Sequence, residues 1–262
     1  LLGKRMKKHI LFIISMLVMP LAVCAKIKLP AYYGDCMVLQ QLATITISGQ
    51  ASSNKKVTLV TSWNNEKYTT RSTSNGSFEI TIITPSAGGP YAMDFFDGEH
   101  LTISDVLIGE LWFCSGQSNM EMPVKGFKGQ PVWGSHASIV KAKESRPIRL
   151  FTVGKKWSKE PQNNLEGEWL LHSSKNVADF SAVAYFFGRF LEEELAVPVG
   201  LINCSWSASK IESWMDFRTL SEIKDVDLSV LEADSFSYPN GTPTLLYNSM
   251  IHPFKGLVVK GV

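Results

Sequence analysis

The chain has 262 residues, of which 45 % are hydrophobic and 19 % are charged, and its formal net charge is +2. This length and composition suit a globular protein with a sizeable core, built as one large domain or two modest ones. The sequence lacks a basic stripe of the kind that nucleic-acid-binding domains carry, so it argues against a nucleic-acid partner.

The first 25 residues have the pattern of a secretory signal peptide. Four basic residues within positions 4–8 precede an apolar run over residues 10–23, and small side chains fit cleavage after Ala25. The run is short for a membrane span, and a lipid anchor on Cys24 is the competing interpretation. We expect an exported protein, periplasmic or extracellular, with no membrane association once the leader is removed. Removal takes away four basic residues and no acidic ones, so the formal charge falls from +2 to −2.

Three cysteines follow the predicted leader: Cys36, Cys114 and Cys204. Their odd number and their spacing give no disulfide framework, and the absence of a CxxC pair argues against a structural zinc site. We therefore expect buried thiols at strand ends, and no metal ion.

The pattern of residues 26–104 predicts a small all-β sandwich domain. Alternating or strand-like stretches occupy Thr44–Gln50, Lys56–Trp63, Gly76–Pro85 and Gly89–Gly98. Asn75-Gly76 and Asp97-Gly98 are typical of hairpin turns, and no stretch of this segment has a helical period.

The pattern changes in residues 105–262, which predict an α/β domain with a parallel sheet. Continuous apolar runs are typical of strands that are covered on both faces. The runs are Val106–Cys114, Ile148–Gly154, Val199–Trp206 and Lys255–Val262. A helix between two such strands favours a parallel arrangement, and the last run lacks the neighbours that would cover it.

The clearest predicted helix lies within Asp179–Gly200. Its apolar residues keep a helical spacing, either Asp179 or Ser181 can cap its start, and Pro198 ends it. The expected core-facing residues are Val183, Phe186, Phe187, Phe190, Leu191 and Leu195.

Two small, polar loops follow two of the predicted strands. Ser118 comes just after the strand Val106–Cys114, and Ser207 to Lys210 come just after Val199–Cys204. Parallel strands end at the same edge of a sheet, where α/β proteins bind ligands. Ordinary strand-to-helix turns would give the same pattern. A serine nucleophile also requires a base and N–H donors for the developing oxyanion, and the amides of Ser118, Ser207 and Ala208 are candidate donors.

The stretch LIGELWFCSGQSNMEMP around Ser118 resembles the nucleophile block of the sialate O-acetylesterase family, within the wider SGNH/GDSL hydrolases. Further segments are similar to this family in the same order and cover most of the chain after the leader. They are Leu29–Gln41, Phe180–Met215 and Pro243–Phe254. The resemblance implies an SGNH-like three-layer α/β/α fold with a parallel sheet, an O-acetylated sugar as substrate, and no cofactor.

The resemblance also implies roles for individual residues. Ser118 would be the nucleophile and its N–H one oxyanion donor, with Gly116, Gln117 and Asn119 as supporting residues of the motif. The family usually has Trp-Gly-Gly-Thr where this chain has Trp206-Ser207-Ala208-Ser209. Ala208 stands where the family pattern has its second glycine. This difference matters if the position requires a positive φ, which glycine adopts more easily than alanine. Glu212 and Trp214 match a Glu-x-Trp pattern that we interpret as loop support.

Two family blocks are missing from the sequence. Both would follow Val262. The first, Gly-Glu-Ser-Asn, would supply a further oxyanion donor, and the second, Asp-x-x-His, would supply the base. We therefore expect a fragment truncated before its third and fifth blocks. Asp97-Gly98-Glu99-His100 has the Asp-x-x-His spacing but is predicted to be a surface turn. His136, His172 and His252 lack an orienting carboxylate in the sequence nearby and are expected to be structural or solvated.

The predicted function is that of an exported carbohydrate esterase that removes acetyl groups from sialic acid or a related sugar through an acetyl-Ser118 intermediate. An acetylxylan-type esterase is one alternative. A catalytically inactive carbohydrate-binding protein with a degenerate hydrolase domain is the other, because the glycine exchanges and the missing base both favour it.

Overall fold

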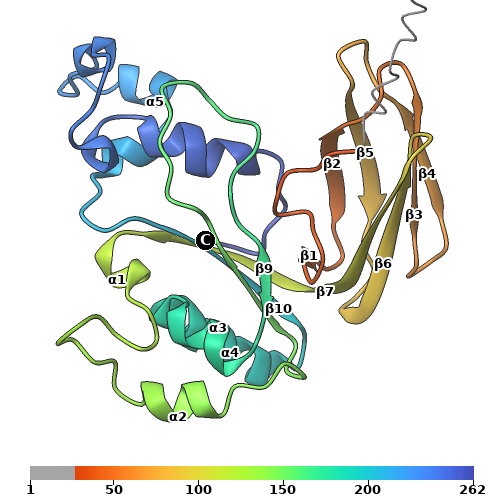
Figure 1. Ribbon diagram of the computed structural model, residues 1–262, viewed down its shortest axis with the longest axis horizontal. Coiled ribbons are helices and arrows are strands. Elements are labelled where there is room, and N and C mark those ends of the chain that lie inside the picture. The colour runs from red at the N-terminus through yellow and green to blue at the C-terminus, as the bar shows by residue number, and fades with distance from the viewer. Residues whose placement is uncertain (1–26) are drawn as a thin grey trace, which may run out of the picture.

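The computed structural model describes residues 27–262 (Figure 1). The predicted leader and Cys24 lie outside the described residues. Among the residues described, no helix is long and apolar enough to span a membrane. The chain folds into a β-rich region, an α/β region and one long strand that belongs to both. The predicted α/β class is confirmed, with a sheet that has both parallel and antiparallel pairs.

The β-rich region consists of strands and turns. Its strands are β1 Val38–Gln40, β2 Thr44–Gln50, β3 Lys56–Thr61, β4 Lys67–Arg71, β5 Ser77–Ile83, β6 Gly88–Phe96 and the first part of β7 His100–Gly116. β2 and β5 form a separate antiparallel pair, and their inward residues, such as Ile47 and Ile80, share a core with Leu59 of β3 and Phe95 of β6. The structure adds β1 and β4 to the strands predicted from sequence in this region.

The strand β7 connects the two regions. Its first part pairs antiparallel with β6, and residues 110–116 pair in parallel with β10 (Val199–Ser205). The boundary predicted between residues 104 and 105 falls inside this strand, at Asp105, whose φ is 53°. One apolar core runs past the boundary, from Phe95 to Phe113 and Phe254. A separate domain over residues 26–104 stays a prediction.

The α/β region is layered around β7, β10, β8 (Ile148–Thr152) and β9 (Trp169–Leu171), with β9 antiparallel to β8. On one face lie α2 (Ser135–Val140), α3 (Ser174–Asp179) and α4 (Ala182–Leu195) (Figure 1). Against the other face pack Leu246, Met250 and Phe254. These three belong to a segment that contains the π-helix η4 (Tyr247–Ile251) and the 3-10 helix η5 (His252–Phe254).

Helix α4 confirms the predicted helix but corrects its orientation. Ser181 is the N-cap and accepts a hydrogen bond from the Ala184 N–H, and the helix ends before Ala196, whose φ is 51°. The buried face consists of Ala182, Ala184, Tyr185 and Gly188. Four residues of the predicted apolar face are exposed instead: Val183, Phe187, Phe190 and Leu195. Gly188 lies directly against Leu201 and brings the helix close to β10, and the four exposed apolar residues lie outside this contact face.

The predicted strand Lys255–Val262 is reduced to a single parallel bridge between Gly261 and Trp112 of β7. The Phe113 N–H donates to the Gly261 carbonyl at 3.0 Å, and the Lys260 N–H donates to the Leu111 carbonyl at 2.7 Å. This bridge lies beside the part of β7 that pairs with β10, so β7 is central in the α/β sheet.

The three cysteines of the described chain are free thiols. Cys114 and Cys204 are buried, as predicted, whereas Cys36 is half-buried. Burial raises the pKa of the Cys114 thiol to about 11 and also raises the pKa of Cys204. Both thiols are therefore protonated at neutral pH and poorly nucleophilic.

Candidate active site

The two predicted loops lie side by side at the carboxyl edge of the parallel strands. Ser205, the last residue of β10, is in register with Gly116, the last residue of β7. One residue further on, the Trp206 N–H donates to the Gly116 carbonyl at 3.1 Å. The loop that starts at Trp206 is therefore fixed next to the turn that carries Ser118.

Ser118 begins the short helix α1 (Ser118–Glu121), directly beyond β7. The turn between strand and helix passes through Gly116, whose φ of +156° favours glycine. Ser118 is half-buried, and with its neighbours from residue 115 to 120 and Val183 of α4 it lines a cavity of about 410 Å³. A hydroxyl in this position is open to a ligand that approaches the sheet edge.

The side chain of Gln117 accepts both hydrogen bonds that Ser118 donates. Its Oε1 lies 2.7 Å from the Ser118 Oγ and 3.0 Å from the Ser118 N. The predicted nucleophile and the predicted oxyanion donor therefore point toward a single oxygen atom. Gln117 is exposed, so its side chain can leave this position without disturbing the core.

Glu121 is a site residue that the sequence analysis missed. Its Oε2 accepts a hydrogen bond from the Ser207 N–H at 2.5 Å, and its Oε1 lies 2.5 Å from the Lys155 Nζ. Burial opposes ionisation, but the hydrogen bonds from Lys155 and Ser207 outweigh it and lower the pKa of Glu121 below its usual value. The only sequence feature that could have pointed to Glu121 as a site residue is its charge between the two methionines of the motif.

Ala208 adopts the left-handed conformation, with φ of +56°. This position is where the family pattern has its second glycine, so the structure gives a physical reason for that glycine. The Asn240 Nδ2 donates to the Ser207 carbonyl at 2.9 Å, and the Tyr238 hydroxyl donates to the Ala208 carbonyl. Within residues 27–262, the Ala208 N–H has no hydrogen-bond acceptor.

The remaining residues of the predicted motif have different surroundings. The Trp214 Nε1 donates to the Ser209 Oγ at 2.8 Å, which ties the Glu-x-Trp segment to the end of the loop. The Glu212 carbonyl accepts from the Thr244 N–H at 3.0 Å, so Glu212 contributes through its backbone. Asn119 is exposed next to Ser118.

None of the four histidines in the described part of the chain is hydrogen-bonded to Ser118. His100 pairs with Asp94 at 2.9 Å and lies at the start of β7, whereas Ser118 follows its end. The 16 steps between residues 100 and 116 correspond to roughly 50 Å of extended strand. His172 is buried against Tyr185, and His252 contacts the Gln162 carbonyl. His136 lies in α2.

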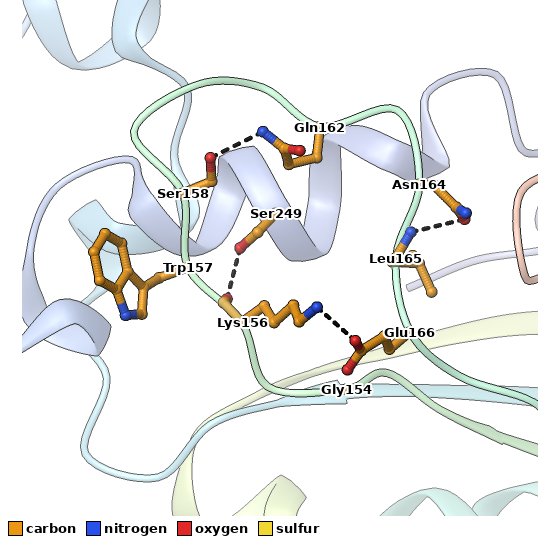
Figure 2. Close-up of a pocket in the computed structure, with 9 residues that line it drawn as sticks. All are labelled: Gly154, Lys156, Trp157, Ser158, Gln162, Asn164, Leu165, Glu166 and Ser249. Atoms are coloured by element: carbon orange, nitrogen blue, oxygen red, sulfur yellow. Dashed lines mark hydrogen bonds and ion pairs between the residues drawn. The ribbon is translucent and has the colours of Figure 1, made fainter.

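A long loop over residues 153–166 contacts the site through Lys155, and Figure 2 shows residues 154–166 of this loop around a second cavity. Lys155 extends from it to Glu121, whereas Lys156 pairs with Glu166 at 2.5 Å, beside a cavity of about 400 Å³. Figure 2 shows this pair and the hydrogen bond that connects Ser249 to the Lys156 backbone. The two consecutive lysines therefore have different partners: Lys155 binds Glu121 at the candidate site, and Lys156 binds Glu166 within the loop.

No group of three or more His, Cys, Asp or Glu side chains with metal-binding geometry occurs in residues 27–262. The groups that the described structure places around Ser118 include the Gln117 amide, the Glu121 carboxylate with its Lys155 partner, and the backbone amides of the 206–208 loop. A serine in the turn after β7, beside the loop after β10 at the carboxyl edge of parallel strands, is a candidate site for acyl transfer.

Comparison with known proteins gives the family. Residues 108–253 match the model of the carbohydrate esterases described as sialic acid-specific acetylesterases, and the chain belongs to that family. The match covers more than half of the chain and includes both loops of the candidate site. The family resemblance predicted from the sequence is confirmed.

Named relatives agree with this assignment. The chain is 28 % identical to sialate O-acetylesterase of Rattus norvegicus, over 84 % of this chain and 45 % of the rat protein. It is also 28 % identical to the Homo sapiens protein of that name, over 84 % of this chain and 42 % of the human protein. A carbohydrate acetylesterase from Xanthomonas citri has a similar structure, with a TM-score of 0.79 and 33 % identity, over 90 % of this chain and 50 % of that one. The chain spans about half the length of these relatives.

Proposed function

We propose that this chain carries the nucleophile of a carbohydrate acetylesterase, and that Ser118 removes O-acetyl groups from sialic acid or a related sugar. The single observation behind this proposal is the adjacency of Ser118 and the 206–208 loop at the sheet edge, in a chain of this family. The description of the family supports an acetyl ester of a sugar as the substrate, and the position of the Ser118 hydroxyl at the sheet edge supports its role as the nucleophile. We further propose that the protein is exported, as the pattern of residues 1–25 predicts.

The proposed reaction has two steps. In the first, the Ser118 Oγ attacks the acetyl carbonyl carbon, its proton passes to a base, and the sugar oxygen leaves as a protonated alcohol. In the second, water attacks the acetyl-Ser118 carbonyl, and acetate and the free serine result. Each step places negative charge on the former carbonyl oxygen, which backbone N–H groups stabilise.

Two amides suit the role of oxyanion donor. The Ser118 N–H becomes available when Gln117 Oε1 moves away, and the Ala208 N–H has no acceptor in the described chain. The Ser207 N–H, an equal candidate from the sequence, already donates to Glu121. We therefore propose Ser118 and Ala208 as the donors.

No histidine of residues 27–262 is hydrogen-bonded to Ser118, so the described part of the chain shows no base in contact with the nucleophile. Loss of a triad member typically lowers the rate by several orders of magnitude. We expect the 262-residue chain to acylate slowly, and we expect Ser118 to be more easily detected by irreversible labelling than by turnover.

A fluorophosphonate probe tests the assignment. Intact-mass and peptide analysis should find the probe on Ser118, and Ser118→Ala should abolish labelling and any hydrolysis of 4-nitrophenyl acetate. Ser115→Ala, in the same cavity wall, serves as the matched serine control and should keep the label. Equal labelling of Ser118→Ala and the parent chain would refute the assignment.

A second function, carbohydrate binding without catalysis, is favoured by the strained Ala208, and by the observation that no histidine of residues 27–262 is hydrogen-bonded to Ser118. Calorimetric titration with O-acetylated and de-O-acetylated sialosides separates the two. Binding of the acetylated sugar without acetate release and without probe labelling would favour the binding protein. An O-acetylated xylo-oligosaccharide in the same series tests the acetylxylan alternative.

A further inference from the structure

We propose that Glu121 is a positioning residue for the proposed esterase. Its carboxylate accepts a hydrogen bond from the Ser207 N–H and pairs with Lys155, and it thereby holds the 206–208 loop so that the Ala208 N–H keeps the single orientation that an oxyanion donor requires. This inference rests on the proposed function and assigns a role to two residues that the family motif does not explain.

The carboxylate connects three separate segments. Glu121 is the last residue of the helix that starts at Ser118, Lys155 lies in the loop after β8, and Ser207 lies in the loop after β10. Each carboxylate oxygen has one partner, at 2.5 Å in both cases. The side chain of Glu121 is 20 % exposed, so these bonds are largely shielded from water. Hydrogen bonds to an ionised group are the stronger kind, and here one links the nucleophile's helix to the donor loop.

Planarity of the peptide bond explains how a bond to Ser207 affects Ala208. The Ser207 carbonyl and the Ala208 N–H belong to one trans peptide unit, so they point in opposite directions. Asn240 fixes the carbonyl at 2.9 Å, and Glu121 fixes the N–H on the other side of Ser207. With both flanks of Ser207 held, the direction of the Ala208 N–H is set.

The same restraints hold Ala208 in its left-handed conformation. An alanine there is less stable than a glycine, by an amount that surrounding contacts have to offset. Tyr238 donates to the Ala208 carbonyl and adds a further restraint. A chain with alanine at this position depends more strongly on Glu121 than one with glycine, because a free loop would leave the strained conformation.

Lys155 is itself fixed by the rest of the loop. The Ser249 Oγ donates to the Lys156 carbonyl at 2.6 Å (Figure 2). The Asn248 Nδ2 donates to the Lys159 carbonyl at 2.7 Å. These bonds attach the loop to η4, which is anchored in the hydrophobic core by Met250. Lys155 also lies 5.9 Å above the Trp206 ring, and it is the charged side chain that acts on Glu121 in the described structure.

The test combines a spectroscopic measurement with a rate. An amide that donates to a carboxylate has a downfield proton shift that follows the ionisation of the acceptor. In ¹⁵N-labelled protein, the Ser207 amide should titrate with Glu121 below the usual pH range of a glutamate. Lys155→Met should move that titration to higher pH, and Glu121→Ala should abolish it. Lys156→Met, which alters the neighbouring lysine of the same loop, is the matched control and should leave it unchanged.

The rate is that of Ser118 labelling by the fluorophosphonate. Removing one oxyanion donor costs about 100-fold or more in enzymes of this kind, so we expect Glu121→Ala to slow labelling at least 10-fold. Glu121→Gln keeps an oxygen that accepts from Ser207, and it should recover most of the rate. Lys156→Met should label at the parent rate.

Failure of the inference differs from failure of the proposed function. If Glu121→Ala labels at the parent rate, or if the Ser207 amide does not titrate, the positioning role is wrong while Ser118 remains the nucleophile. If the parent chain is not labelled at Ser118, both proposals fall. Slow labelling of Glu121→Ala with recovery in Glu121→Gln is the result that supports the inference.

Discussion

The Ser207 N–H donates a 2.5 Å hydrogen bond to the Glu121 carboxylate, across 86 residues of sequence. This contact joins the loop after β10 to the helix that begins with Ser118. It occupies one of the amides that the sequence offers as an oxyanion donor and leaves the next one, Ala208, without an acceptor in residues 27–262.

The first prediction concerns the pH dependence of stability. Because the folded pKa of Glu121 is lowered, its ionised form stabilises the fold above the unfolded pKa of about 4.3, and that stability is lost as the pH falls through the folded pKa. At pH 7 we expect Glu121→Gln to unfold about 1.5 kcal/mol more easily than the parent chain. The difference should shrink when urea unfolding is repeated at stepwise lower pH, below about 4.

Glu166→Gln is the control for this measurement. Glu166 also pairs with a lysine, but its side chain is 67 % exposed, so the pair should contribute less than about 0.5 kcal/mol at any pH. A constant difference between Glu121→Gln and the parent chain from pH 7 to pH 3 would contradict the assignment of an ionised, hydrogen-bonded Glu121.

The second prediction concerns backbone strain at Ala208. The left-handed conformation costs an alanine roughly 1–2 kcal/mol, and a glycine costs about 0.5–1 kcal/mol more entropy on folding. We therefore expect Ala208→Gly to stabilise the chain by about 0.5 kcal/mol in chemical denaturation. Ala196, with φ of 51° after α4, is the matched control, and Ala196→Gly should give a similar gain. Destabilisation by the first substitution alone would mean that residue 208 does not hold this conformation in solution.

The sequence predicted the position of Ser118 because the determinants are local. A continuous apolar run identifies a buried strand, and the glycine that follows it marks the turn. Ser181 and Pro198 likewise set the ends of α4 through capping and backbone restriction. The same local signals located β2, β3, β5 and β6 almost residue by residue.

The parts that could not be predicted depend on contacts between distant segments. Glu121 has no local signal for its bond to Ser207, since the partner is 86 residues away. The apolar residues of α4 suggested the wrong face, because Phe187 and Phe190 are exposed while Gly188 packs against the sheet. The change of pattern at Asp105 suggested a boundary, but the strand continues through it with a new set of neighbours.

The third prediction concerns an ion pair at that position. The Arg149 Nη2 of β8 lies 2.9 and 3.1 Å from the two carboxylate oxygens of Asp105 in β7, and the arginine side chain is 7 % exposed. Arg149→Met leaves the Asp105 carboxylate without its ion-pair partner, so it should destabilise the chain by about 2–3 kcal/mol. Asp105 is 36 % exposed, which places the expected loss below that of a fully buried pair.

A double-mutant cycle with Asp105→Asn measures the pair itself. Asparagine tolerates the positive φ of residue 105, so this substitution removes the charge without new backbone strain. We expect a coupling energy of at least about 1 kcal/mol from denaturation of the two single variants and the double variant. Additive losses would show that the two side chains act independently.

The fourth prediction uses α4, where helix propensity and packing give opposite signs. Replacing glycine by alanine inside a helix normally adds about 1 kcal/mol of stability. At Gly188, however, a Cβ atom would lie 2.5 Å from Cδ1 of Leu201, a fully buried residue of β10. Overpacking of this kind costs about 1–3 kcal/mol, so Gly188→Ala should destabilise the chain in urea denaturation. Combining it with Leu201→Val should recover part of the loss, because valine leaves room for the new methyl group.

Phe190→Ala, at a side chain that is 59 % exposed, should change stability by less than about 0.5 kcal/mol. If Phe190→Ala were instead the costly substitution and Gly188→Ala stabilising, the face of α4 that packs on the sheet would be the one that the apolar pattern predicts.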